Sequence, residues 1–117
     1  MKDIEKVVNF IAQCRHMVLA VTLEDGRPWA VPVKVQGRGD NFVEWDSRTD
    51  TLHSQSIEND PRVMILFYDT TKDDQVGVYM QASVTNVEAN GEYARYRATI
   101  EHTWLNDESY IKREIIS

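Results

Sequence analysis

The chain has 117 residues, 42% of them hydrophobic and 27% charged, which indicates one globular domain over residues 1–117 and excludes a disordered tail. Asp and Glu number 19 against 13 Lys and Arg, so the net charge is −6 at pH 7. This acidic balance argues against a role in nucleic-acid binding, because nucleic-acid-binding proteins usually present a basic face.

Cysteine usage and hydropathy predict a cytoplasmic protein. The single cysteine, Cys14, cannot form a disulfide within the chain. The N-terminal segment MKDIEKVVNF is charged and lacks the apolar core of a signal peptide. No uncharged run approaches the ~20 residues that span a bilayer, so no contact with a membrane is expected.

The first third of the chain reads as a helix followed by a hairpin. Residues 2–16 are predicted to be helical, because apolar side chains recur at helical spacing at Ile4, Val7, Val8, Ile11 and Cys14. Residues 17–23 and 28–35 are predicted strands, joined by a tight turn at Glu24–Gly26. Two prolines in the second strand place it at a sheet edge or barrel rim. A turn follows at Gly37–Asn41.

The middle of the chain alternates strand, polar loop and short helix. Phe42–Asp46 is a predicted strand. Thr51–Asn59 shows no alternation and is predicted to form one or two helical turns, which Asp50 or Thr51 caps and Pro61 ends.

The remaining segments are mostly strands. Arg62–Tyr68 is nearly all apolar and is predicted to be a central strand, and residues 76–87 form a long strand. Asn90–Gly91 is compatible with a second tight hairpin or with the start of a helix. The spacing of Tyr93, Arg97, Ile100 and Trp104 favours a helix over residues 91–103.

A last strand is predicted at Ser109–Ile116. The succession of helix, short-turned strands and helix predicts a mainly β, α+β fold. We expect a small antiparallel split β-barrel with flanking helices.

One polar segment stands out as a candidate site. Ser47, Arg48, Thr51 and His53 bring hydroxyls, a guanidinium and an imidazole together before a short helix. With the free N–H groups of the helix start, these side chains are suited to a phosphate. Lys34 adds a second cation if the strands pair. The alternative interpretation is a solvated polar connection with a helix cap.

Several other chemistries have no support in the sequence. There is no Walker loop, no G-x-G-x-x-G and no nucleophile elbow. The three histidines are far apart and no cysteine pair exists, so no metal site is predicted. No side chain stands out as a catalytic acid or base.

The order of these parts resembles the pyridoxamine-5′-phosphate-oxidase-like family of FMN-binding split barrels. The resemblance rests on VLAVTLEDGRPWAVPVKV, NFVEWDSRTDTLHSQSIENDPRVMILFYD and GVYMQASVTNVE in succession after a leading helix. It includes the stretch Ile57–Val63, where the family has an Asn-x-Pro-Arg-Val-like ending. It covers most of residues 1–89.

The resemblance implies a site that holds the FMN phosphate. Lys34 lies where the family has a basic residue, and Ser47 and Thr51 lie at its hydroxyl positions. His53 replaces the usual Lys and Leu52 the usual Arg, so Arg48 would have to compensate.

The resemblance also implies a homodimer with the flavin at the subunit interface. Backbone groups of Val31, Pro32 and Val33 and of the strand end at Trp45 and Asp46 would edge the flavin ring. Trp104 and Arg113 resemble late positions that meet the partner's flavin.

The function that follows is FMN-dependent electron or hydride transfer with an unknown partner. True pyridoxamine phosphate oxidase activity is not expected, because the chain is too short for the family's substrate-binding segment. The alternative is a non-enzymatic barrel that binds haem, a deazaflavin, a phosphorylated metabolite or nothing.

Overall fold

The computed structural model describes residues 2–107, 109 and 111–115. The helices and strands are α1 (Asp3–Gln13), β1 (His16–Thr22), β2 (Pro28–Lys34), β3 (Gly37–Arg38), β4 (Phe42–Arg48), α2 (Leu52–Asn59), β5 (Arg62–Tyr68), β6 (Gly77–Asn90), β7 (Tyr93–Asn106) and β8 (Lys112–Ile115).

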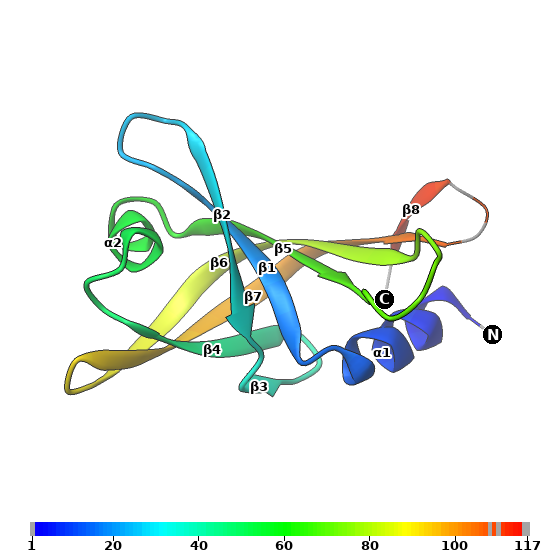
Figure 1. The fold of residues 1–117 in the computed structure, drawn as a ribbon, viewed down its shortest axis with the longest axis horizontal. Helices are drawn as coiled ribbons and strands as arrows, with labels where there is room; N and C mark the ends of the chain where they lie inside the picture. The colour runs from blue at the N-terminus through cyan, green and yellow to red at the C-terminus, as the bar shows by residue number, and fades with distance from the viewer. Residues whose placement is uncertain (1, 108, 110, 116–117) are drawn as a thin grey trace.

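The eight strands form one antiparallel sheet in the order β2-β1-β5-β6-β7-β4-β3, with β8 paired to β7 (Figure 1). The sheet bends back on itself because only Val35 and Gln36 separate β2 from β3. The amide of Gln36 donates to the carbonyl of Glu44 on β4 at 2.9 Å. The predicted split barrel of α+β class is thereby confirmed.

Alternation along the strands builds the core inside this barrel. On β1, Met17, Leu19 and Val21 are buried, while the residues between them are partly exposed. Trp45, Ile65 and Phe67 are fully buried in the same cluster. Helix α1 adds Val7, Ile11 and the capping residue Cys14 to that cluster, so its apolar stripe is used for packing.

The cysteine is a core residue. Cys14 is buried, and its Sγ lies 3.6 Å from the carbonyl oxygen of Phe10 and 3.9 Å from that of Tyr68. Burial raises the pKa of the thiol above its ordinary value. A thiol of this kind packs as a small apolar group.

The predicted helix over residues 91–103 is wrong. This segment lies within β7, and Asn90 pairs with Tyr93 across a two-residue turn in which Gly91 has φ +66°. Ala94, Tyr96 and Ala98 point inward with a period of two, a pattern that the helical spacing of other residues obscured. Pairing with β6 and β4 satisfies the backbone hydrogen-bonding groups on both edges of β7. This outweighs the local helix propensity of the segment.

Other expectations hold with small shifts of boundary. Strand β2 is an edge strand that pairs with β1, β5 lies inside the sheet, and Thr51 caps α2. The turn expected at residues 37–41 contains the two-residue strand β3, which the sequence analysis missed. Strand β8 falls inside the strand expected at 109–116, of which residues 110 and 116 lie outside the described residues.

The outside of the barrel has two contrasting faces. On β4 and the first half of β7, cross-strand ion pairs join Asp46 to Arg95 at 2.8 Å and Glu44 to Arg97 at 2.9 Å. On the other side the strand register brings partly exposed or exposed side chains into a row across five strands. We call this the outer apolar row: Pro32, Val18, Leu66, Tyr79 and Trp104. At the β6 position of this row, the ammonium of Lys112 on β8 lies 4.2 Å from the centre of the Tyr79 ring.

Candidate functional site

A cluster of hydroxyl groups and one imidazole lies where β4 leads into α2. His53 Nε2 lies 3.0 Å from Ser47 Oγ and 3.4 Å from Thr51 Oγ1. Thr51 Oγ1 accepts the backbone N–H of Ser54 at 3.2 Å and lies 2.8 Å from its hydroxyl. The Ser54 hydroxyl in turn donates to the carbonyl of Arg48 at 2.8 Å. We call Ser47, Thr51, His53 and Ser54 the hydroxyl cluster.

Local sequence explains this arrangement. Thr51 has extended backbone and Ser54 lies three positions after it, which is the spacing at which a cap side chain meets the third helical N–H. The α2 turn then carries His53 back toward the end of β4, where Ser47 points inward. Ser54 was missed by the sequence analysis, although this three-residue cap spacing marks it.

His53 is neutral at pH 7 in this environment. It is partly buried, and desolvation lowers its pKa from the ordinary value of 6.5. No carboxylate among the described residues contributes to this shift, so nothing there stabilises the imidazolium. The cluster therefore offers hydrogen bonds without a formal charge.

Arg48 is engaged with two carboxylates. Its guanidinium makes two hydrogen bonds of 3.0 Å to Asp50 and one of 3.0 Å to Glu92. It also lies 5.9 Å from the centre of the Tyr93 ring. The guanidinium that the sequence analysis assigned to a phosphate is thus paired with two carboxylates in this structure.

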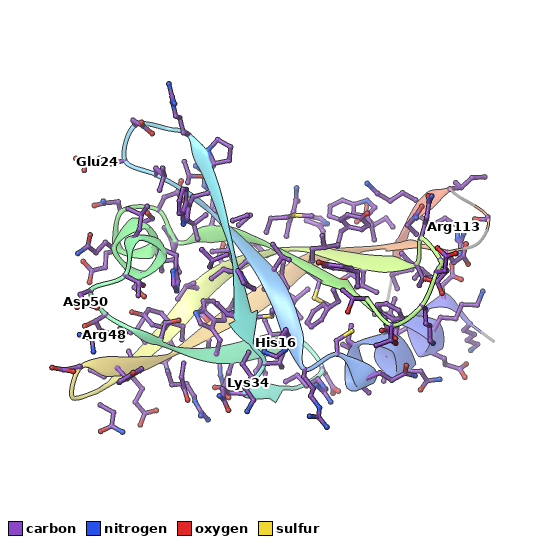
Figure 2. The ribbon with its side chains drawn as sticks, in the orientation of Figure 1. His16, Glu24, Lys34, Arg48, Asp50 and Arg113 are labelled. Atoms are coloured by element: carbon purple, nitrogen blue, oxygen red, sulfur yellow. The ribbon has the colours of Figure 1, made fainter. Side chains whose placement is uncertain are left out.

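The remaining basic candidate lies elsewhere. Lys34 is exposed at the end of β2, where it pairs with His16 of β1. Figure 2 shows Lys34 beside His16 and apart from Arg48 and Asp50. Leu52, which the sequence analysis compared with a basic position, is exposed at the first turn of α2. Among the described residues, neither side chain makes a hydrogen bond or ion pair to the hydroxyl cluster.

The two residues predicted at the end of β4 have different surroundings. Trp45 is fully buried and stacks on Tyr96 with ring centres 5.7 Å apart. Asp46 faces outward and makes two hydrogen bonds to Arg95, which lower the pKa of its carboxyl. Both side chains are therefore engaged within the chain, and the sequence analysis assigned only the backbone groups of these two residues to a ligand.

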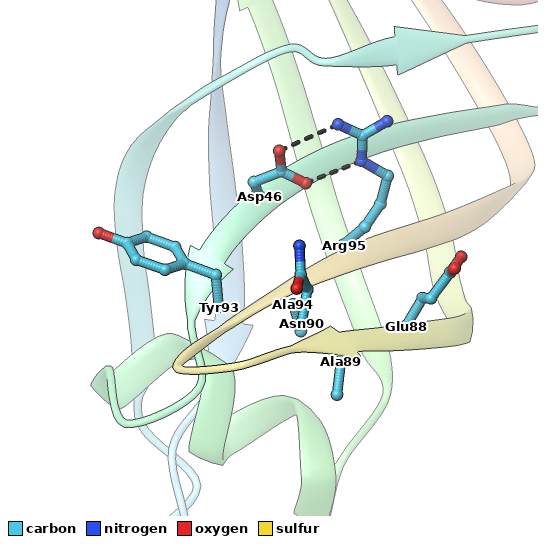
Figure 3. A pocket seen from close by; sticks show the side chains of 7 residues that line it. All are labelled: Asp46, Glu88, Ala89, Asn90, Tyr93, Ala94 and Arg95. Atoms are coloured by element: carbon cyan, nitrogen blue, oxygen red, sulfur yellow. Dashed lines mark hydrogen bonds and ion pairs between the residues drawn. The ribbon is translucent and has the colours of Figure 1, made fainter.

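A surface pocket of about 500 Å³ lies beside this Asp46–Arg95 pair (Figure 3). It is lined by Asp46, Glu88, Ala89, Asn90, Tyr93, Ala94 and Arg95. In this pocket Arg95 and Asp46 bind each other, so this charge pair is not available to a ligand.

On β2, the three predicted residues alternate. Val33 is buried, Val31 is partly buried and Pro32 is exposed on the outer apolar row. Because β2 is an edge strand, its second backbone edge is open to a ligand or a second chain.

Trp104 and Arg113 are separated from the hydroxyl cluster and from each other. Trp104 pairs with Glu114 and Leu105 with Arg113, so the two residues point to opposite faces of the sheet. Arg113 binds Asp3 and Asp107 at 3.0 and 2.8 Å, which anchors α1 near β8. Figure 2 places Arg113 at the opposite end of the long axis from Arg48 and Asp50. Within one chain they do not meet.

The hydroxyl cluster fits a ligand's polar groups but does not fit a phosphate dianion. Its hydroxyls and the first N–H groups of α2 can bind oxygen atoms. A dianion, however, requires a positive charge close by. Among the described residues at this site, the His53 side chain is neutral and the Arg48 guanidinium is already paired with carboxylates.

The architecture and this site define a split β-barrel with an uncharged polar site at one end. The family model for pyridoxamine 5′-phosphate oxidase matches residues 4–115. The chain therefore belongs to this family. No curated protein matches it.

Solved structures agree with the fold. A protein from Clostridium acetobutylicum related to general stress protein 26 of B. subtilis superposes with a TM-score of 0.79 at 10% identity, covering 95% of this chain and 92% of that chain. A heme-binding protein from Mycobacterium smegmatis gives 0.86 at 13% identity, covering 98% and 58%. A protein described as an F420 reductase gives 0.73 at 9% identity, covering 81% and 93%. At these identities the likeness concerns the fold alone.

Two further observations concern the described part of the chain. None of its helices is long and apolar enough to cross a bilayer. Within the same residues, no group of three His, Cys, Asp or Glu side chains is arranged to hold a metal ion.

Proposed function

We propose that this chain is a homodimeric, flavin-binding redox protein of the cytoplasm, with FMN as the first flavin to test. The observation that carries the proposal is the hydroxyl cluster at the start of α2, a helix that lies against β1 and the edge strand β2 in a barrel of this family. A bound flavin would supply electron or hydride transfer, while the protein positions it and sets its surroundings.

The chain's own residues have separate roles in this proposal. Ser47 and Thr51 donate or accept hydrogen bonds to the polar tail of the flavin, and His53 holds the Ser47 hydroxyl in place. Backbone groups of residues 31–33 border the ring. No described side chain is assigned as a proton donor or acceptor for the reaction, so redox chemistry rests on the flavin.

The outer apolar row supports the homodimer. Val18, Leu66 and Tyr79 lie next to each other across three neighbouring strands and remain partly exposed in one chain. Burying this face against a second copy removes apolar surface from water, which favours association. Trp104 lies at the end of the same row, so in the dimer it would face the partner.

A second candidate is a binding module for another ligand. The uncharged side chains Leu52 and His53 favour it, because they remove the cations that a phosphate would use. Haem and a deazaflavin are the first ligands to test, since two structural neighbours are described as a heme-binding protein and an F420 reductase.

The experiment is an absorption spectrum of the purified protein followed by titration with FMN, with flavin fluorescence as the signal. Flavin bands near ~370 and ~450 nm, or quenching that saturates at about micromolar FMN, are expected. Ser47→Ala should weaken binding about tenfold, because one ligand hydrogen bond and the His53 contact are lost.

Thr49→Ala is the matched control. It removes a nearby hydroxyl that hydrogen-bonds to the carbonyl of Glu92 and does not belong to the cluster. Absence of both bands and saturable quenching would reject the flavin and direct the search to haem and deazaflavin.

A further inference from the structure

Four basic side chains gather where the end of α1 meets β1, β2 and β3. We call them the basic corner: Arg15, His16, Lys34 and Arg38. The amide of Val35 donates to the carbonyl of Arg15 at 2.8 Å, and the strand register sets Lys34 opposite His16 (Figure 2). Arg38 donates to the carbonyl of Ala12 at 3.2 Å and so reaches back to α1. The fold thus joins residues from three separate segments of the chain.

The basic corner lacks the carboxylate partners that the other arginines have. Each arginine outside it makes an ion pair at 2.8 to 3.9 Å: Arg27, Arg48, Arg62, Arg95, Arg97 and Arg113. Among the described residues, the side chains of Arg15, His16 and Lys34 make no hydrogen bond or ion pair, and Arg38 binds only a carbonyl. In a chain of net charge −6, three positive charges without a carboxylate partner therefore lie together, and such a place attracts anions.

A pocket of about 280 Å³ adjoins this corner. Its lining includes Arg15 and His16 of the basic corner, and Val18, Pro32 and Tyr68 supply apolar surface. Ligand pockets start at about 300 Å³, so a molecule that fits here is small. Positive charge beside apolar surface is the chemistry that recognises an organic acid.

The electrostatic surroundings of this pocket are positive in balance. Its one lining carboxylate, Asp69, accepts the N–H of Thr71 at 2.9 Å and the Thr71 hydroxyl at 2.6 Å, so it is engaged within its own loop. Burial and Asp69 raise the pKa of the Cys14 thiol in the lining, whereas Arg38 and Lys72 lower it. These two cations therefore act at the pocket in addition to the guanidinium in its lining.

We propose that this pocket binds a small organic anion. The carboxylate or phosphate group of the ligand contacts Arg15 and His16, and the rest of the basic corner adds electrostatic attraction. The apolar part of the ligand lies against Pro32 and Tyr68. No residue of the hydroxyl cluster lines this pocket, so the inference goes beyond the proposed flavin site and does not depend on it.

The test is an amide NMR titration of the purified chain at low salt and pH 8. The anionic probes are benzoate and phenyl phosphate, and benzyl alcohol and benzylamine are the neutral and cationic probes of similar size. The anions should shift the signals of Arg15, His16 and Thr70 and saturate at about millimolar concentration. The other two probes should bind at least about tenfold more weakly, because only an anion gains a charge-assisted hydrogen bond to the guanidinium.

Two outcomes of this titration would overturn the proposal. One is equal binding of the anionic, neutral and cationic probes. The other is the absence of a saturable shift with either anion up to about 10 mM. The signals of the hydroxyl cluster should stay in place throughout, so this result and that of the FMN titration are read separately.

Two arginine variants separate the pocket from the overall charge of the protein. Arg15→Gln should weaken binding of the anions about tenfold, because it removes a charge-assisted hydrogen bond and keeps a polar side chain. Arg27→Gln is the matched control, since it removes the same charge from the exposed β1–β2 turn and should leave binding unchanged. Equal losses in both variants would reject the pocket as the binding site. The ligand-free spectra of both variants check that the fold persists.

Discussion

At the residue scale, the surroundings of His53 set the charge of the hydroxyl cluster. A Lys at this position would keep its charge in contact with water, but the imidazole is partly buried against Ser47 Oγ at 3.0 Å and loses it. The residue identity was visible in the sequence. Its protonation state and its hydrogen-bond partner depend on how far α2 turns back toward β4.

His53 should make folding stability depend on pH. Burial lowers its pKa below 6.5 in the folded state, so the unfolded chain binds the proton first as the pH falls. Stability should therefore decrease as the pH drops through 6.5 and level off below the folded-state pKa. His53→Gln keeps a hydrogen-bonding side chain without this titration.

The measurement is the urea midpoint of both proteins at pH 8 and pH 5.5. The wild type should lose more stability between these values than the His53→Gln variant does. His16 and His102 are present in both proteins, so their contributions cancel. Identical losses would show that His53 does not titrate differently in the two states.

At the element scale, the β6–β7 hairpin decides the architecture. These two strands, of 14 residues each, pair with each other along almost their whole length. Strand β6 also pairs with β5, and β7 also pairs with β4 and β8. Had residues 91–103 been helical, β4 would have lost its partner in the sheet and the barrel would not close. Gly91 lies in the two-residue turn between these strands and has a positive φ.

Gly91→Ala should destabilise the protein by about 1 kcal/mol, because a Cβ disfavours the left-handed region. The site has open space around the position of a Cβ, so this effect is one of backbone conformation alone. The free energy of unfolding in urea measures it. Gly91→Asn is the control and should cost less, since Asn tolerates positive φ better than Ala does. Equal costs would indicate another origin.

At the scale of the whole molecule, the outer apolar row and the ion-paired face give the barrel two unlike sides. The ion pairs Asp46–Arg95 and Glu44–Arg97 face water on β4 and β7. The apolar side is the one on which a second copy is proposed to pack. A ligand at the proposed interface would then contact the hydroxyl cluster, the edge strand β2 and the apolar side.

Leu66→Glu should convert the proposed dimer into a monomer. Leu66 lies between Val18 and Tyr79 on the row, where a carboxylate would be buried without a partner on association. Light scattering coupled to size-exclusion chromatography measures the mass, and circular dichroism checks that the fold persists.

Asn86→Glu, exposed on β6, adds the same charge elsewhere and should leave the mass unchanged. A folded Leu66→Glu variant that keeps the dimeric mass would place the interface on another face. A wild-type chain that is monomeric at micromolar concentration would reject the dimer itself.

The sequence by itself determined the barrel class, most strands and the polar segment at residues 47–53. Local signals are sufficient for these features: alternation, turn residues and a cap are properties of neighbours in the chain. Residues 91–103 were misjudged because strand pairing with β4 and β6 is non-local and overrides helix propensity.

Only the tertiary structure decided which charges are available at the site. Arg48 and Glu92 are 44 positions apart in sequence, and their ion pair exists because β4 lies against β7. Asp50, two positions after Arg48, binds the same guanidinium from the loop that follows β4. Charge state and charge pairing depend on burial and on distant neighbours, so residue type and spacing alone did not show that His53 is desolvated and that Arg48 is paired.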